Sequence, residues 1–180
     1  MNDVEMLHGT KLIHELNNLI VLDFDAIVSY DHAIQHCDDP RAHRDLQLFR
    51  DDHVRHIDHL SKVIRSCEGT PIEPHRDLKG VVLEGLTTLR SLGGTLPALR
   101  AMRTNEQITN RIYRKAASVA LAPIARVVID ENYADEQRHL AVIQAHIERM
   151  SGTAVVTTSS IPTPIPFDDR DTIPTTRRTR

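Results

Sequence analysis

Residues 50–56 read Arg50-Asp51-Asp52-His53-Val54-Arg55-His56, and a related segment, Asp135-Glu136-Gln137-Arg138-His139, follows 83 positions later in the chain. The same offset relates Asp23 to Glu106, Tyr30 to Tyr113, Pro40 to Pro123, His53 to Glu136 and His56 to His139. A self-match at one constant offset indicates a repeated structural unit. The sequence therefore predicts two helical hairpins, each of which contributes half of one central polar site.

Four segments of the chain have the hydrophobic pattern of bundle helices. Within residues 11–37, 40–67, 96–120 and 123–150, core-type residues recur in alternating steps of four and three positions, which is typical of helices that pack against one another. Asp39 and Pro40 supply an N-cap and a first-turn proline between the first two segments. Gly69 is expected to take the left-handed conformation that ends a helix.

The order of these segments predicts the fold class and the domain boundaries. Residues 71–94 form a long connection, in which 78–92 are amphipathic and are expected to form a short helix. Two short hairpins joined by one long crossover predict an all-α four-helix bundle over residues 1–150. Residues 151–180 are rich in Thr, Pro and Ser and lack an apolar period, so we expect a disordered tail.

Composition excludes several classes of protein. Aromatic residues make up 3% of the 180 residues, Trp is absent and the net charge is −3, which gives no reason to expect nucleic-acid binding. The start of the chain lacks the pattern of a secretory signal, and no apolar stretch is long enough to span a bilayer. We therefore expect a cytoplasmic protein in which Cys37 and Cys67, at opposite ends of a hairpin, are reduced thiols.

Six ionisable residues occupy the middle of the four apolar stripes: Asp23, His53, His56, Glu106, Glu136 and His139. In a bundle these positions meet in one interior layer, where charged groups are very costly unless they are paired or bind a cation. The i, i+3 spacing of the histidines and of Glu136 with His139 projects both members of each pair inward. The sequence therefore predicts a metal site, with Tyr30 and Tyr113 beside it.

These motifs resemble those of the ferritin-like di-iron carboxylate proteins, such as bacterioferritin and rubrerythrin. The segment from Asp23 through Ala26 to Tyr30 is similar to the family's first-helix pattern, Glu136-Gln-Arg-His139 matches its Glu-x-x-His motif, and His53-Val-Arg-His56 stands where the other such motif belongs. The resemblance covers residues 10–150. It implies a ferritin-like fold, iron at the six-residue site, ferroxidase or peroxide-scavenging activity with dioxygen or peroxide, and homo-oligomers. Tyr30 and Tyr113 would be the catalytic candidates, as partners of the ligands or one-electron donors.

Two departures from the family pattern leave alternatives open. His53 replaces a Glu that bridges two metal ions in the family, and a neutral imidazole offers one lone pair to one ion. A single ion held by His53 or His56 with His139 and Asp23 is therefore an alternative, with zinc or manganese in place of iron. A second hypothesis is a non-catalytic, structural or stress-associated module with a degenerate site. Val54 stands where bacterioferritins have a haem-binding Met, so no haem is expected.

Overall fold

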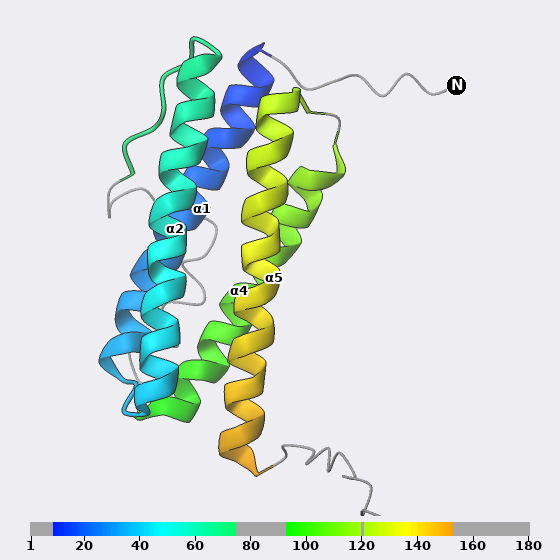
Figure 1. Ribbon diagram of the computed structural model, residues 1–180. Helices are drawn as coiled ribbons and strands as arrows, with labels where there is room; N and C mark the ends of the chain where they lie inside the picture. The colour runs from blue at the N-terminus through cyan, green and yellow to red at the C-terminus, as the bar shows by residue number, and fades with distance from the viewer. Residues whose placement is uncertain (1–8, 75–92, 120, 153–180) are drawn as a thin grey trace, which may run out of the picture.

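The computed structural model describes residues 9–74, 93–119 and 121–152, and these residues form four α-helices (Figure 1). The helices are α1 (Gly9–Gln35), α2 (Pro40–Ser66), α4 (Thr95–Ser118) and α5 (Pro123–Ser151). The predicted all-α class is confirmed, and each predicted boundary falls within two residues of the observed one. The short helix expected in residues 78–92 and the disorder expected in the C-terminal tail lie outside the described residues.

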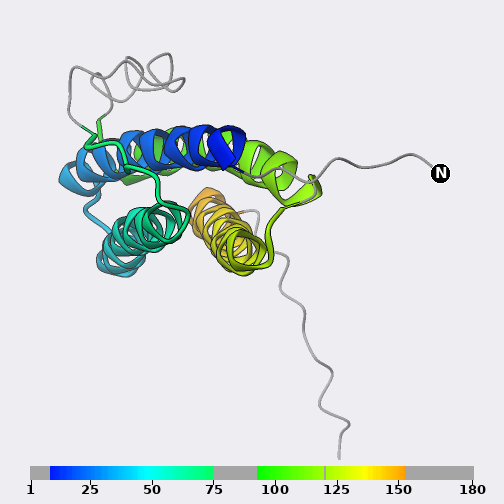
Figure 2. The ribbon, with the colours of Figure 1, turned by 90° about the horizontal axis from the view of Figure 1, so that it is seen from above.

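The two hairpins pack side by side. Helices α1 and α4 form one layer and α2 and α5 form the other (Figure 2). The hydroxyl of Thr95 accepts hydrogen bonds from the backbone N–H groups of Asp38 (2.8 Å) and Asp39 (3.2 Å), so α4 begins beside the turn between α1 and α2. Helices α2 and α4 therefore run in the same direction. A short turn cannot join two parallel helices, so a long connection between them is needed.

Local capping explains where the helices begin and end. The side chain of Asp39 accepts a hydrogen bond from the N–H of Ala42 at 2.9 Å, and Pro40 lies in the first turn of α2, as predicted. At the second hairpin the guanidinium of Arg126 donates hydrogen bonds to the carbonyls of Ala117 and Val119. These bonds satisfy groups that a helix end leaves without partners. Helix α5 is capped at its C-terminus by Gly152, whose φ is 69°.

The end of α2 corrects one prediction. Glu68, and not Gly69, has the left-handed conformation, with φ of 59°. The N–H of Glu68 bonds the carbonyl of Arg65 at 3.0 Å and the N–H of Gly69 bonds that of Ile64 at 2.9 Å, the pattern of a Schellman motif. Gly69 instead leaves room for Ile13, since a Cβ there would lie 2.7 Å from Cδ1 of Ile13 and that side chain would have to shift.

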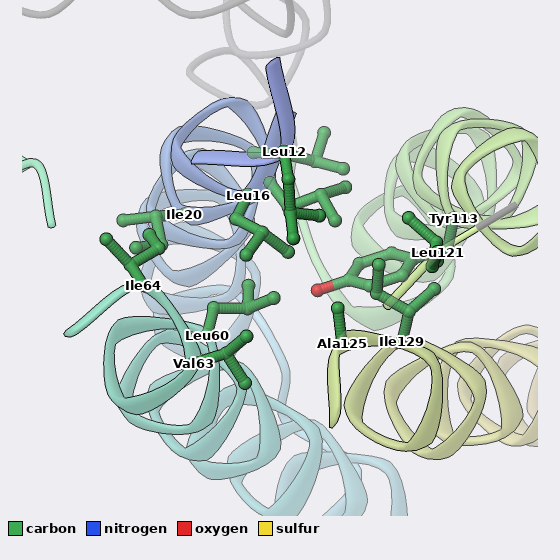
Figure 3. Close-up of a cluster of buried hydrophobic side chains, with 12 residues drawn as sticks. Leu12, Leu16, Ile20, Leu60, Val63, Ile64, Tyr113, Leu121, Ala125 and Ile129 are labelled. Atoms are coloured by element: carbon green, nitrogen blue, oxygen red, sulfur yellow. The ribbon is translucent and has the colours of Figure 1, made fainter. Parts of the chain in front are cut away.

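Two apolar clusters fill the two ends of the bundle. One contains Leu12, Leu16, Leu60, Ile129 and Tyr113 among others, and lies where α1 begins (Figure 3). The other contains Tyr30, Leu46, Leu99, Met102 and Ile143 among others. The buried polar residues of the four stripes lie between the two clusters. None of the described helices is long and apolar enough to cross a membrane, and Cys37 and Cys67 are free thiols, as expected.

Candidate metal centre

The fold brings the six ionisable residues of the apolar stripes into one interior layer. Helix α1 supplies Asp23, α2 supplies His53 and His56, α4 supplies Glu106, and α5 supplies Glu136 and His139. All six side chains are buried, at 0 or 1% exposure. Their potential ligand atoms gather in two groups, within each of which the atoms lie no more than 4.8 Å apart. The groups are Asp23, His53, His56, Glu136 and His53, Glu106, Glu136, His139.

The division into two groups bears on the single-ion alternative. Asp23 belongs only to the first group and His139 only to the second. The single-ion alternative that joins Asp23 with His139 therefore takes its ligands from both groups. His53 and Glu136 belong to both groups and are themselves related by the 83-residue offset.

The two tyrosines connect the halves of the duplicated unit. The hydroxyl of Tyr30 donates a hydrogen bond to Oε1 of Glu106, and that of Tyr113 donates one to Oδ2 of Asp23, each at 2.6 Å. Each tyrosine thus holds the acid of the other half. Burial, together with the adjacent carboxylate in each case, raises the pKa of both phenols well above 10. Both hydroxyls therefore keep their protons at neutral pH.

A pair of aspartates holds the outer nitrogens of two histidines. His139 Nε2 lies 3.0 Å from Oδ2 of Asp52, and His56 Nε2 lies 3.2 Å from Oδ2 of Asp135. Asp52 also accepts hydrogen bonds from Arg55 and Arg138, as does Asp135. Both aspartates have a pKa below the usual range, because these partners outweigh the effect of burial. Ionised aspartates only accept, so each Nε2 carries a proton and each Nδ1 is turned toward the interior.

Neither Asp52 nor Asp135 is among the six ligands that the sequence predicts. The 83-residue offset relates Asp52 to Asp135 and Arg55 to Arg138, so the signal was present in the motif that opens the repeat. What the offset does not reveal is that each aspartate bonds the histidine of the opposite hairpin.

Two asparagines were also missed, Asn132, which is buried, and Asn110, which is half-buried. Asn132 donates a hydrogen bond to the hydroxyl of Tyr113 at 3.2 Å. Asn110 donates to the carbonyls of Glu106 (2.9 Å) and Glu136 (2.8 Å) and so ties α4 to α5 beside the site. The residue equivalent to Asn132 in the first hairpin is Phe49, whose ring stacks on His139 at 4.3 Å between centroids. The repeat is therefore only approximate around the polar layer.

Charge pairing in the layer is strongest around His53. Nδ1 of His53 lies 2.9 Å from Oδ1 of Asp23. Burial alone would lower the pKa of His53, but the nearby carboxyl groups of Glu136, Asp23 and Glu106 raise it well above 6.5. Burial would raise the pKa of Asp23 and Glu106, yet the nearby histidines hold both below the usual range. In the metal-free protein Asp23 and Glu106 are thus anions and His53 is a cation.

The remaining three groups have different protonation states. Burial acts to lower the pKa of His56, but the carboxylate of Asp23 and the carboxyl group of Glu136 raise it to about 9. Burial raises the pKa of Glu136 to about 8, against the opposing effect of His53. Burial lowers the pKa of His139. At pH 7 the layer therefore holds two anions and two cations, with Glu136 and His139 neutral.

Several polar atoms in this balanced layer still have no hydrogen-bond partner. They are Nε2 of His53, Nδ1 of His56, Nδ1 of His139, Oε2 of Glu106 and both carboxyl oxygens of Glu136. Buried polar atoms in folded proteins are almost always hydrogen-bonded, because leaving one unpaired costs about 1–3 kcal/mol. Imidazole nitrogens and carboxylate oxygens are the ligands that iron, zinc and manganese take in proteins. The donor set therefore fits a metal ion of this class.

The outer aspartates provide a first test of this arrangement. Replacing Asp52 or Asp135 by Asn removes the charge that orients one histidine, and we expect roughly 10–100-fold weaker binding of Zn(II). Competition with a chromophoric chelator measures the affinity. Asp51→Asn is the matched control, because Asp51 is exposed and pairs with Arg50. Equal affinities in all three variants would contradict the role of these aspartates.

Comparisons with known proteins agree with the fold. A solved structure from Anabaena variabilis ATCC 29413, described as a two-domain protein containing DJ-1/ThiJ/PfpI-like and ferritin-like domains, matches with a TM-score of 0.62 and 14% identity. The match covers 88% of this chain and 41% of that chain, so this chain spans less than half of its length. No curated protein is significantly similar to this chain.

A family model extends the comparison to the sequence. Residues 11–118 match the family described as a domain of unknown function, DUF2383. The matched range includes Asp23, His53, His56 and Glu106 and ends at the last residue of α4, before Glu136 and His139. The match covers more than half of the chain, which therefore belongs to the DUF2383 family and has a ferritin-like four-helix bundle fold.

Proposed function

We propose that this protein binds iron in the buried layer between its two hairpins and acts as a ferroxidase or a peroxide scavenger. The observation that carries the proposal is the convergence of unpaired nitrogen and oxygen atoms from all three histidines, Glu106 and Glu136 in one fully buried layer. An apolar bundle core would not retain such atoms without a compensating ligand. Bound iron would supply one-electron chemistry toward dioxygen or peroxide.

The residues of the layer have distinct parts in this proposal. Asp23, Glu106 and Glu136 would balance the charge of the ion. Tyr30 and Tyr113 would fix the orientation of Glu106 and Asp23 through their 2.6 Å hydrogen bonds, and as buried phenols they are candidate electron donors. The clusters above and below the layer exclude water. The ferritin-like fold supports the proposal only as an analogy, because fold does not determine function.

The decisive experiment combines metal content with Fe(II) oxidation. We expect protein purified without chelator to contain iron, and the metal-free protein to oxidise added Fe(II) faster than buffer alone. Asp23→Ala and Glu136→Ala should abolish that excess rate. Tyr30→Phe and Tyr113→Phe should bind Fe(II) and oxidise it more slowly. A site that remains empty after anaerobic addition of Fe(II), or an unchanged rate in the two alanine variants, would reject the function.

A second candidate function is a non-catalytic module with a degenerate or single-ion site, for example one holding zinc. The contact between Asp23 and His53 favours it, because this ion pair partly satisfies the layer without metal. This candidate predicts a melting temperature that barely changes when iron or a chelator is added. A tightly bound ion stabilises the folded state by about 2.7 kcal/mol at one hundred times its dissociation constant, so a large shift would count against it.

The protonation states predict how metal affinity depends on pH. His56 and Glu136, with pKa values of about 9 and about 8 in the metal-free protein, must lose their protons to bind an ion. Affinity should therefore increase as pH rises from 6 to about 9 and level off above. Because His53 is also a cation in the metal-free protein, calorimetry in two buffers of different ionisation enthalpy should detect about three protons or more released per chain at pH 7. Binding without proton release would contradict these assignments.

A further inference from the structure

We propose that His53 binds two divalent ions at once, one through Nδ1 and the other through Nε2, so that the site is dinuclear with a histidine bridge. The inference rests on the proposed metal binding and specifies how many ions bind and how they are connected. It concerns the position where the sequence departs from the carboxylate pattern.

The two nitrogens of His53 face different groups of ligands. Nδ1 lies 2.9 Å from Oδ1 of Asp23 and 3.5 Å from Oε1 of Glu136, on the side of the first group. Nε2 lies 3.8 Å from Oε1 of Glu106, on the side of the second group, and has no hydrogen-bond partner. A histidine that served one ion only would leave its second nitrogen facing a carboxylate of the other group.

Glu136 shows the same division between its two oxygens. Oε1 lies 3.4 Å from Nδ1 of His56, in the first group, whereas Oε2 lies 4.0 Å from Nδ1 of His139, in the second. The members of the groups that are not shared also correspond by the 83-residue offset, Asp23 with Glu106 and His56 with His139. His53 and Glu136 are thus the equivalent, shared pair, and each presents one donor atom to either side.

Charge balance favours the bridge. Two divalent ions bring four positive charges into a layer whose side chains are at most 1% exposed, and Asp23, Glu106 and Glu136 supply three negative charges. A His53 ring that has lost both ring protons supplies the fourth, and the layer is neutral. A neutral His53 ring, which keeps one of its two ring protons, could bind only one ion. The other ion would then lack its fourth protein ligand, and one positive charge would remain uncompensated, which is costly in a buried site. The ring protons leave to solvent and no electron is transferred.

The surroundings of His53 hold its ring in this orientation. The rings of Tyr30, His56 and His139 each lie 5.4 Å from it between centroids. The hydrogen bond of Tyr30 to Glu106 fixes the first of these neighbours. Rotation of His53 away from the two groups would displace packed side chains, so both nitrogens remain directed at the ligands.

Copper(II) provides a probe, because an imidazolate bridge couples two copper ions magnetically and removes their ordinary paramagnetic resonance signal. The Glu136→Gln variant serves as the blank, because the copper that it binds measures the ions held at surface histidines. After this amount is subtracted, we expect the metal-free protein to take up two Cu(II) per chain. Most of this specific copper should be silent in the resonance spectrum. Acidification, which protonates the bridge, should restore the signal.

Two variants at the same position complete the test. His53→Gln, a neutral side chain that cannot bridge in this way, should reduce the specific copper from two ions to one and give an ordinary signal. His53→Glu should retain two ions without the imidazolate coupling. One ion per chain in the unmodified protein, or two ions that give a full signal, would overturn the bridge while leaving metal binding intact. No specific binding of either copper or iron would reject the proposed function itself.

Discussion

Glu136→Gln should abolish tight metal binding while leaving the bundle folded. Glu136 belongs to both groups of ligand atoms, and both of its oxygens lack a hydrogen-bond partner in the metal-free protein. Loss of this carboxylate removes a ligand and a charge from each group. Losing a residue that only hydrogen-bonds a metal ligand can weaken metal binding roughly 100-fold. Because Glu136 is itself a ligand, we expect the affinity of the variant for Fe(II) or Zn(II) to fall by more than this. Anaerobic titration of the metal-free variant measures the loss.

The same variant should be no less stable than the unmodified protein when metal is absent. Burial keeps Glu136 protonated at pH 7, with a pKa of about 8, and an amide of the same shape replaces a carboxyl that is already neutral. Chemical denaturation in the presence of a chelator tests this, and Gln137→Ala, at an exposed position on the same helix, is the control. A variant that keeps tight binding, or that unfolds, would contradict the assignment of Glu136 as the shared ligand.

Of the variants proposed here, Asp23→Asn should cause the largest decrease in the free energy of unfolding of the metal-free protein. The carboxylate of Asp23 lies 2.9 Å from Nδ1 of His53 and accepts the hydrogen bond of Tyr113, all within the fully buried layer. Removing one partner of a buried ion pair leaves the other charge uncompensated, which typically costs on the order of 3 kcal/mol or more. We expect a decrease of this size in the free energy of unfolding, measured by urea denaturation with a chelator present.

Asp58→Asn is the matched control for this prediction. Asp58 lies on the surface of α2 and pairs with Lys62 one helical turn away, at 2.6 Å. Exposed ion pairs of this kind contribute little, so the control should denature like the unmodified protein. If Asp23→Asn also did so, Asp23 and His53 would not form a charged pair in the folded protein.

The helices and the residues that line the bundle could be predicted from the chain alone. The alternating steps of four and three identified the buried stripes, and the break at Asp39-Pro40 and the second proline, Pro123, located the turns to within two residues. These features depend on neighbours three or four positions away, which a sequence displays directly. The inward direction of Asp23 and Glu136 followed from the same periodicity.

The partners of these side chains depended on the tertiary structure. Tyr30 bonds Glu106, 76 positions away, and Tyr113 bonds Asp23, 90 positions away. The offset of the repeat marks equivalent residues but does not indicate which of them meet across the hairpins. Because the hairpins pack with α2 against α5, each histidine meets the aspartate of the opposite unit, which fixes its interior nitrogen.

The end of α2 and the grouping of the ligands show the same limit. The sequence determined that a helix stops near Gly69, but only the tertiary structure shows that Ile13, on another helix, lies against this glycine and that Glu68 takes the left-handed conformation. The sequence likewise determined that six ionisable residues meet in one layer. That His53 and Glu136 lie between two groups of ligands depended on how the four helices pack. The two groups combine side chains from all four helices, whose distances from one another the sequence does not show.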